Sequence, residues 1–302
     1  VEAEDGTRAQ YDRLLLATGS NPVILPIPGT QLDGVLTYRD IHDTEAMIAA
    51  SARCKRAVVI GGGLLGLEAA NGLKLRGMDV TVVHLMPWLM ERQLDHTAGT
   101  MLQRSLEAKG LAFALEAHSS AILGDERGHV RSLQLKSGEE IAAELVVMAV
   151  GIRPNTALAE SAGLHCSRGI VVNDTMQTYD PRVYAVGECV AHRGVSYGLV
   201  APLYDMARVC ARHLAGLGAS AFRGAVPATR LKVTGIEVFS AGDFTPRAGD
   251  EELVYEDLPA RVYRKLVVRG GRLAGAVMVG DVSDAAWYQD LISNGRTLCG
   301  LR

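Results

Sequence analysis

The chain has 302 residues, a formal net charge of −3 and a hydrophobic content of 48%. This length suggests about two domains, each able to bury a core. The near-neutral charge gives no electrostatic footprint for nucleic acid or an acidic membrane surface, and no apolar run approaches the roughly 20 residues that span a bilayer. We therefore expect neither nucleic acid nor a membrane as a partner.

The cysteines and the first residue bear on the origin of the chain. No two of the five cysteines are close enough for a CxxC motif, so the sequence shows no zinc or iron–sulfur ligand set. An odd number of cysteines without a secretory signal favours free thiols in a reducing cytoplasm. Because the chain begins with Val1 rather than methionine, we expect it to be a fragment of a longer protein.

The first predicted elements are a buried strand and a helix. The apolar run at residues 14–17 predicts a strand that stops at a turn of small residues, Thr18, Gly19 and Ser20. Prolines at positions 22, 26 and 28 predict a stiff, extended connection, because proline is unsuited to a helix interior. Residues 40–51 then show helical spacing of apolar side chains.

The next segment is the clearest in the chain. Residues 57–60 predict a short apolar strand, and a glycine-rich turn follows at residues 61–66. Residues 67–76 have helical composition, and residues 79–83 predict a second strand rich in β-branched side chains. A strand, glycine turn, helix and strand within about 30 residues are typical of a βαβ unit.

The glycine turn carries the main functional signal. Gly61, Gly63 and Gly66 fit the pattern GxGxxG between a strand and a helix. The first glycine permits a tight turn, the second lets a pyrophosphate approach the backbone, and the third lets the helix pack closely on the strand. The phosphates would then lie at a helix N-terminus, where free N–H groups and the helix dipole favour negative charge. We therefore predict that Gly61, Gly63, Leu64, Leu65 and Gly66 bind a nicotinamide dinucleotide.

The residue at the end of the second strand departs from the usual NAD pattern. An Asp or Glu there would hold the adenosine ribose 2′-hydroxyl of NAD, but this chain has His84. His84 can donate a hydrogen bond to a hydroxyl or to a phosphate, and no Arg or Lys follows immediately to bind a 2′-phosphate. The sequence leaves NADH and NADPH open and favours NADH.

The rest of the chain predicts two further regions. A helix at residues 95–109 and strands near residues 112–115, 130–135 and 145–149 lead to Gly151. A strand at residues 183–186 then stops at Gly187 and Glu188, and residues 203–214 predict a helix with Pro202 in the favoured first position. The last 80 or so residues alternate strand patterns and end in a helix near residues 285–292, which predicts a small α+β domain.

Three strand-ending turns around one GxGxxG unit resemble the flavoprotein disulfide reductase superfamily, whose members have two dinucleotide-binding domains. The turns lie at residues 17–19, 149–151 and 184–188. The resemblance implies that the first two turns join the domains and contact the cofactors, through Ala17, Thr18, Gly19 and Gly151.

The same resemblance implies roles for five further residues. Gly187 and Glu188 would bind the ribityl–pyrophosphate region of FAD, and the helix after Pro202 would face the pyrimidine edge of the flavin. Reduced flavin carries negative charge at that edge, which a helix N-terminus stabilises. Arg39 would approach the flavin, and Glu68 would lie beside the nicotinamide as the catalytic residue.

Four longer strings are similar to the large subunits of NAD(P)H-dependent assimilatory nitrite reductases. They cover residues 84–95, 198–214, 231–244 and 280–291, and the resemblance extends over essentially the whole chain. It implies that hydride passes from NAD(P)H to FAD. Electrons would then pass through iron–sulfur centres to sirohaem in downstream redox domains, where nitrite becomes ammonium.

The resemblance also implies that parts of the parent protein lie outside this chain. The family's first GxGxxG, which holds the ADP part of FAD, is expected before Val1, and the iron–sulfur and sirohaem ligands are expected after Arg302. We therefore expect an N-terminally truncated, Rossmann-like α/β fold. Its parts would be a split FAD-binding domain at residues 1–40 and 155–222, a nicotinamide domain at residues 41–154, and an α+β interface domain at residues 223–302.

Two alternative functions and one assembly remain open. The chain could belong to a rubredoxin- or ferredoxin-type NAD(P)H reductase, which shares the same domains. It could also be a non-catalytic nucleotide-binding module, because its FAD site is expected to be incomplete; alone, it is expected to be inactive on nitrite. Exposed strand edges invite association, so a homodimer is also an expectation.

Overall fold

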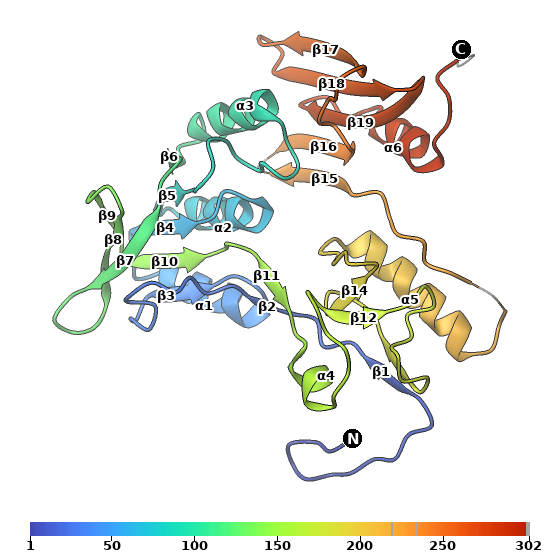
Figure 1. The fold of residues 1–302 in the computed structure, drawn as a ribbon. Coiled ribbons are helices and arrows are strands. Elements are labelled where there is room, and N and C mark those ends of the chain that lie inside the picture. Colours follow the sequence, from blue (N-terminus) through green and yellow to red (C-terminus); the bar gives the residue numbers. More distant parts are fainter. Residues whose placement is uncertain (219, 234, 300–302) are drawn as a thin grey trace. The chain divides into compact units, whose positions relative to one another are not determined.

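The fold is described from a computed structural model over residues 1–218, 220–233 and 235–299 (Figure 1). The chain divides into two compact units. Unit 1 comprises Val1–Asn21 and Ile152–Ala225, and unit 2 comprises Pro22–Gly151 and Val226–Arg302. Unit 2 thus holds both the predicted nicotinamide domain and the predicted C-terminal domain, and the finer three-part division stays a prediction.

A parallel sheet forms the centre of unit 2. Its strand order is β3-β10-β4-β5-β6, and each pair of neighbours is parallel. The strands are β3 (Val35–Thr37), β4 (Arg56–Ile60), β5 (Asp79–Val83), β6 (Ala112–Ala114) and β10 (Leu145–Met148). Because parallel neighbours need crossover connections, helices separate them in sequence: α1 (Ile41–Ser51), α2 (Leu64–Leu75) and α3 (His96–Glu107).

Both faces of this sheet are buried, as the β-branched strands predict. Successive side chains of a strand point to opposite faces, so Val59 and Val82 join a core with α1, α2 and α3, whereas Val58 and Val146 join a second core. The second core is closed by an antiparallel layer, whose strands are β7 (Ser119–Gly124), β8 (Val130–Leu135) and β9 (Glu140–Ala142) (Figure 1).

An antiparallel sheet follows in the last part of unit 2. Its order is β15-β16-β19-β18-β17, with strands β15 (Ala228–Val233), β16 (Ile236–Gly242), β17 (Glu251–Asp257), β18 (Val262–Arg269) and β19 (Arg272–Val279). One face packs on α6 (Ala285–Asn294), and the other contributes Val238, Tyr263 and Val277 to the helical core of unit 2. The sequence patterns indicated these strands except β17.

A buried polar contact ties this sheet to α3. Asp95 caps the N-terminus of α3 by accepting a hydrogen bond from the backbone N–H of Ala98 at 3.0 Å. The other oxygen of Asp95 accepts a hydrogen bond from the Tyr263 hydroxyl at 2.8 Å and lies 3.3 Å from Lys265 Nζ. Burial, followed by the bond to Asp95, raises the pKa of Tyr263, so this hydroxyl keeps its proton. One carboxylate therefore orients both the helix start and the sheet.

Unit 1 is built from short strand pairs, two of which are parallel, and two helices. β1 (Leu14–Leu16) pairs with β13 (Val183–Ala185), β12 (Ile170–Val172) pairs with β14 (Val190–His192), and β2 (Ser20–Pro22) lies beside β11 (Ile152–Pro154). The helices are α4 (Ala157–Ser161) and α5 (Val200–Leu214), and Leu16, Tyr184 and Met206 are buried between these elements. Within the described residues, no helix of either unit has the length and apolar character to span a membrane.

Two predicted helix starts are wrong. α5 begins at Val200 with Leu199 as its N-cap, so Pro202 is the third helical residue rather than the first. Proline is tolerated there because the N–H groups of a first helical turn have no intrahelical acceptor. α2 begins at Leu64 rather than residue 67, because the glycine turn itself supplies the N-cap, Gly63.

The cysteines differ sharply in exposure. In the described part of the chain all five are free thiols: Cys189 and Cys210 are buried, Cys54 and Cys166 are partly buried, and Cys299 is exposed. Burial raises the pKa of Cys210 to about 11. The same described residues contain no group of three or more His, Cys, Asp or Glu side chains suited to a metal ion.

Thiol labelling should follow this order of exposure. At pH values near 8, a disulfide reagent should modify Cys299 rapidly, whereas Cys210 should react only after unfolding, because little thiolate forms below its raised pKa. Mass spectrometry of the labelled native protein measures both sites. Rapid modification of Cys210 in the native state, at a rate matching Cys299, would contradict the buried position of Cys210 in α5.

Candidate functional site: a glycine turn at the carboxyl edge of the parallel sheet

The predicted site residues of unit 2 that follow β3, β4, β5 and β10 gather at one edge of the sheet. The glycine turn follows β4, His84 follows β5, the turn to Gly151 follows β10, and Arg39 lies two residues after β3. Parallel strands bring their carboxyl ends to a common edge, which is where ligands bind in open α/β sheets. The topology thus assembles these segments from four separate stretches of sequence.

The three glycines of the motif meet different surroundings. Gly61 has a left-handed φ of +122°, and an added Cβ would lie 2.3 Å from the carbonyl oxygen of Ala149. A Cβ on Gly66 would lie 1.9 Å from the carbonyl oxygen of Gly61, so only glycine lets α2 approach β4 this closely. Gly63 has an ordinary φ of −84°, and a Cβ there would meet nothing within 4 Å. The fold needs the first and third glycines, whereas the second borders open space.

The N-terminus of α2 faces the same turn. Gly63 caps the helix and gives its first N–H groups no side-chain hydrogen bond. Those of Leu64, Leu65 and Gly66 have no intrahelical acceptor because they belong to the first turn. N–H groups of this kind, together with the helix dipole, favour an anion. The surroundings therefore fit a diphosphate, whose approach the missing side chain of Gly63 permits.

His84 lies beneath the turn and is 7% exposed. Its Nδ1 accepts a hydrogen bond from the backbone N–H of Gly62 at 3.0 Å, and its Nε2 lies 3.1 Å from Glu91 Oε2. The backbone N–H of Met90 donates to the carbonyl oxygen of Gly62 at 3.0 Å. Both backbone groups of Gly62 are thus held by the segment after β5. Whether His84 itself contacts a cofactor stays a prediction.

Glu68 lies one turn into α2. Its side chain is exposed, but partial loss of water around the carboxyl group raises its pKa. Burial, and then the charge of Glu68, raises the pKa of Tyr38, which follows β3. The neighbouring Arg39 donates its backbone N–H to Asp43 at 2.7 Å. Glu68 is therefore an acid near the glycine turn whose charged form is disfavoured relative to a fully solvated glutamate.

The predicted flavin residues other than Arg39 belong to unit 1. β1 and β13 are parallel neighbours in register at Leu16 and Ala185, so the turn at Thr18 and the turn at Glu188 follow adjacent strand ends. Ser20 Oγ donates to Glu188 Oε2 at 2.7 Å. This bond joins the two turns directly.

Two backbone contacts shape the same edge. Thr18 Oγ1 donates to the carbonyl oxygen of Asn155 at 2.7 Å, and the backbone N–H of Asn155 donates to the carbonyl oxygen of Gly19 at 2.9 Å. Gly19 and Gly187 adopt left-handed φ values of +66° and +91°, and a Cβ on either would meet nothing within 4 Å. The backbone at these two glycines is therefore open to a ligand. Ala17 starts this turn, and Pro202 lies buried in α5 of the same unit.

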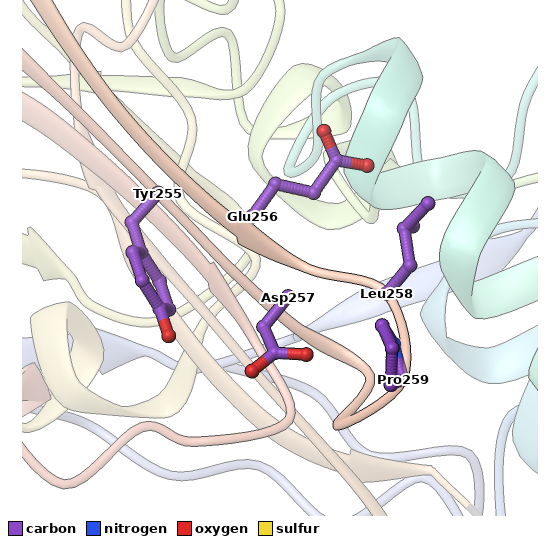
Figure 2. Close-up of a pocket in the computed structure, with 5 residues that line it drawn as sticks. All are labelled: Tyr255, Glu256, Asp257, Leu258 and Pro259. Atoms are coloured by element: carbon purple, nitrogen blue, oxygen red, sulfur yellow. The ribbon is translucent and has the colours of Figure 1, made fainter.

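A surface hollow in the C-terminal sheet does not resemble either site. It lies at the end of β17 and is lined by Tyr255, Glu256, Asp257, Leu258 and Pro259 (Figure 2). Figure 2 shows the carboxylate of Glu256 pointing away from that of Asp257, as alternation along a strand requires. Two carboxylates and no basic side chain do not suit the phosphates of a dinucleotide.

Sequence reasoning missed one polar residue at the glycine turn, Glu91. The usual acid follows the second strand directly, whereas Glu91 lies eight residues after the end of β5 at Val83. Met90 precedes it with a left-handed φ of +54°, which no local pattern indicates for methionine. The run of apolar residues between His84 and Glu91 gives no other signal.

Comparison with known proteins identifies the family and the fold. Residues 1–210 match the family model described as pyridine nucleotide-disulphide oxidoreductase, and residues 227–296 match the rubredoxin NAD+ reductase C-terminal domain. A solved ferredoxin reductase from Rhodopseudomonas palustris superimposes with a TM-score of 0.88 at 26% identity, covering 98% of this chain and 73% of that one. The predicted Rossmann-like α/β fold is confirmed.

Two relatives from Bacillus subtilis are more similar in sequence. A nitrite reductase [NAD(P)H] is 55% identical over 281 residues, which cover 93% of this chain and 35% of the relative. An assimilatory nitrate reductase electron transfer subunit is 45% identical over 288 residues, which cover 95% of this chain and 37% of the relative. The chain spans about a third of the length of each, and the predicted resemblance to nitrite reductases is confirmed. Through the match over residues 1–210, the chain belongs to the pyridine nucleotide-disulphide oxidoreductase family.

Proposed function

We propose that this chain is the flavin-reducing region of an assimilatory nitrite reductase, which takes hydride from NAD(P)H and passes it to FAD. The observation that carries the nucleotide part is the open space at Gly63, beside the N-terminus of α2, where the N-cap makes no side-chain hydrogen bond. The glycines on either side are required by close backbone packing, but nothing in the fold requires Gly63. An approaching diphosphate explains it.

The residues of unit 2 fit a nicotinamide dinucleotide. The N–H groups of Leu64, Leu65 and Gly66 would hold its pyrophosphate, and Gly151 borders the same edge of the sheet. Glu68, one turn further along α2, would lie beside the nicotinamide. A carboxylate there stabilises the positive charge that the nicotinamide ring gains as it loses hydride. Its partly desolvated position strengthens that interaction, because the local dielectric is lower than in water.

The residues of unit 1 fit part of an FAD site. Glu188, fixed by Ser20, presents a carboxylate that can accept hydrogen bonds from ribityl hydroxyls, and Gly19 and Gly187 leave room for the cofactor. Bound FAD would supply the redox chemistry, accepting a hydride and releasing single electrons. The N-terminus of α5, which includes Pro202, would favour negative charge on the reduced flavin. A contact from Arg39 belongs to the same proposal.

The onward path lies in redox domains of the parent protein. By its resemblance to nitrite reductases, the parent would pass electrons through iron–sulfur centres to sirohaem and reduce nitrite to ammonium. The match of residues 227–296 to a rubredoxin reductase domain favours a second candidate, transfer to a small redox protein. The 55% identity to a nitrite reductase over 93% of the chain favours the first. A cytoplasmic location and a homodimer belong to the proposal as well.

Nucleotide binding can be separated from folding at Gly63. The Gly63→Glu variant should lose NADH affinity by a factor of about 10 or more, because a carboxylate would occupy the phosphate position. Its thermal midpoint should stay close to that of the unchanged protein, since a Cβ there meets nothing within 4 Å. Calorimetric titration with NADH and thermal unfolding measure the two properties.

Gly72→Ala is the matched control. It changes another glycine of α2 whose Cβ position is open, and it should leave NADH affinity unchanged while stabilising the helix by about 0.5–1 kcal/mol. NADH binding that is equally strong in Gly63→Glu and Gly72→Ala would contradict the proposed phosphate site.

Flavin binding distinguishes an FAD-dependent oxidoreductase from a non-catalytic nucleotide-binding module. With FAD added, the chain should become yellow after gel filtration, and NADH should bleach the oxidised flavin under anaerobic conditions. Glu188→Ala should weaken FAD retention about tenfold, because a hydrogen bond to a charged acceptor is lost. A colourless protein that cannot be loaded with FAD, yet binds NADH, would favour the module.

A further inference from the structure

Glu91 combines a fixed position with access to solvent at the glycine turn. Its side chain is 23% exposed, whereas that of its partner His84 is only 9% exposed. The hydrogen bond from Met90 N–H to Gly62 O fixes the backbone immediately before Glu91, and the left-handed φ of Met90 turns the chain at that point. The segment that follows β5 therefore returns to the glycine turn at Met90, which places the carboxylate of Glu91 close to it.

The hydrogen bonds of His84 determine how Glu91 is held. Because Nδ1 accepts from the backbone N–H of Gly62, the proton of a neutral ring must reside on Nε2. Nε2–H then donates to Glu91 Oε2 at 3.1 Å. A continuous chain of two hydrogen bonds thus links the backbone of the glycine turn to one oxygen of the carboxylate. The other oxygen, Oε1, lies 3.9 Å from Nε of Arg92 and is not part of this chain.

We propose that Glu91, positioned by His84, accepts hydrogen bonds from the adenosine ribose hydroxyls of the nicotinamide dinucleotide and sets a preference for NADH over NADPH. This inference rests on the proposed binding of a dinucleotide at Gly63. In βαβ sites the ribose lies near the end of the second strand, where an acid usually follows the strand directly. Here His84 occupies that place, and the acid comes from a position seven residues further along.

The carboxylate also disfavours a 2′-phosphate. A ribose hydroxyl can donate to Glu91, whereas a phosphate has only acceptor oxygens and carries like charge. Arg92 is a neighbouring cation that could offset this repulsion. Its side chain is 86% exposed and its distance to Glu91 exceeds that of a hydrogen bond, so solvent screens its charge. The geometry therefore favours the unphosphorylated ribose.

The test compares dissociation constants for NADH and NADPH in the 302-residue chain and its variants. The unchanged protein should bind NADH more tightly. Glu91→Gln should reduce the ratio of NADH to NADPH affinity about tenfold or more, because it removes both the charged acceptor and the repulsion. Glu107→Gln, which neutralises an exposed carboxylate at the end of α3, should leave the ratio unchanged. Arg92→Gln should change it less than about twofold.

The role of His84 is positioning, and a double-mutant cycle tests it. His84→Ala should lower the NADH preference in the presence of Glu91 but have no further effect on it in the Glu91→Gln background, because both changes remove the same interaction. His84→Gln, whose amide can still accept from Gly62 and donate to Glu91, should restore most of the preference. A general loss of stability would instead lower both affinities equally and leave their ratio intact.

Two results would overturn the inference alone, and a third would reject the proposed function. An unchanged NADH preference in Glu91→Gln, with NADH binding still lost in Gly63→Glu, rejects the role of Glu91 alone. A preference for NADPH that disappears in Arg92→Gln rejects the electrostatic assignment. An unchanged protein that binds neither nucleotide rejects the proposed function, and this inference with it.

Discussion

The close approach of α2 to β4 is the constraint on which the site depends. Because a Cβ added to Gly66 would lie only 1.9 Å from the carbonyl oxygen of Gly61, any side chain at position 66 would push the helix away from the strand. Keeping the helix there places its N-terminus, whose N-cap makes no side-chain hydrogen bond, at the carboxyl edge of the sheet. The open space at Gly63 lets a phosphate reach the N–H groups of the first helical turn, to which the N-cap residue gives no side-chain hydrogen bond.

Hydrogen bonds from the segment after β5 hold the glycine turn in place. Gly62 is bonded through its N–H to His84 and through its carbonyl to Met90, so the turn cannot shift without disturbing the segment after β5. The same segment leads to Asp95, which caps α3 and bonds Tyr263 of the C-terminal sheet. The glycine turn is thereby supported through a continuous set of contacts in unit 2, a rigid base of the kind that binding sites need.

Much of unit 2 could be predicted because its signals are local. The β-branched run after the glycine turn indicates a buried strand, and the spacing of Gly61, Gly63 and Gly66 indicates the helix approach. Helix starts were less predictable, because a cap depends on backbone geometry rather than on residue type. Strand β17 was missed because its side chains are almost all exposed, so its sequence EELVYED lacks the alternation that marks a half-buried strand.

The position of Glu91 beside the glycine turn could not be predicted from the sequence. Its approach to the turn depends on a left-handed methionine and on a hydrogen bond between residues 62 and 90, neither of which leaves a local pattern. The predicted roles of Thr18 and Glu188 came from family resemblance instead. The structure adds that their strands are parallel neighbours and that Ser20 bonds Glu188.

The most direct measurement of the central claim is a crystal structure of this chain with NADH bound. The account predicts that the diphosphate lies against the backbone N–H groups of Leu64, Leu65 and Gly66, with the space beside Gly63 filled by phosphate oxygens. A diphosphate bound elsewhere, with the turn at residues 61–66 free of ligand, would contradict the account.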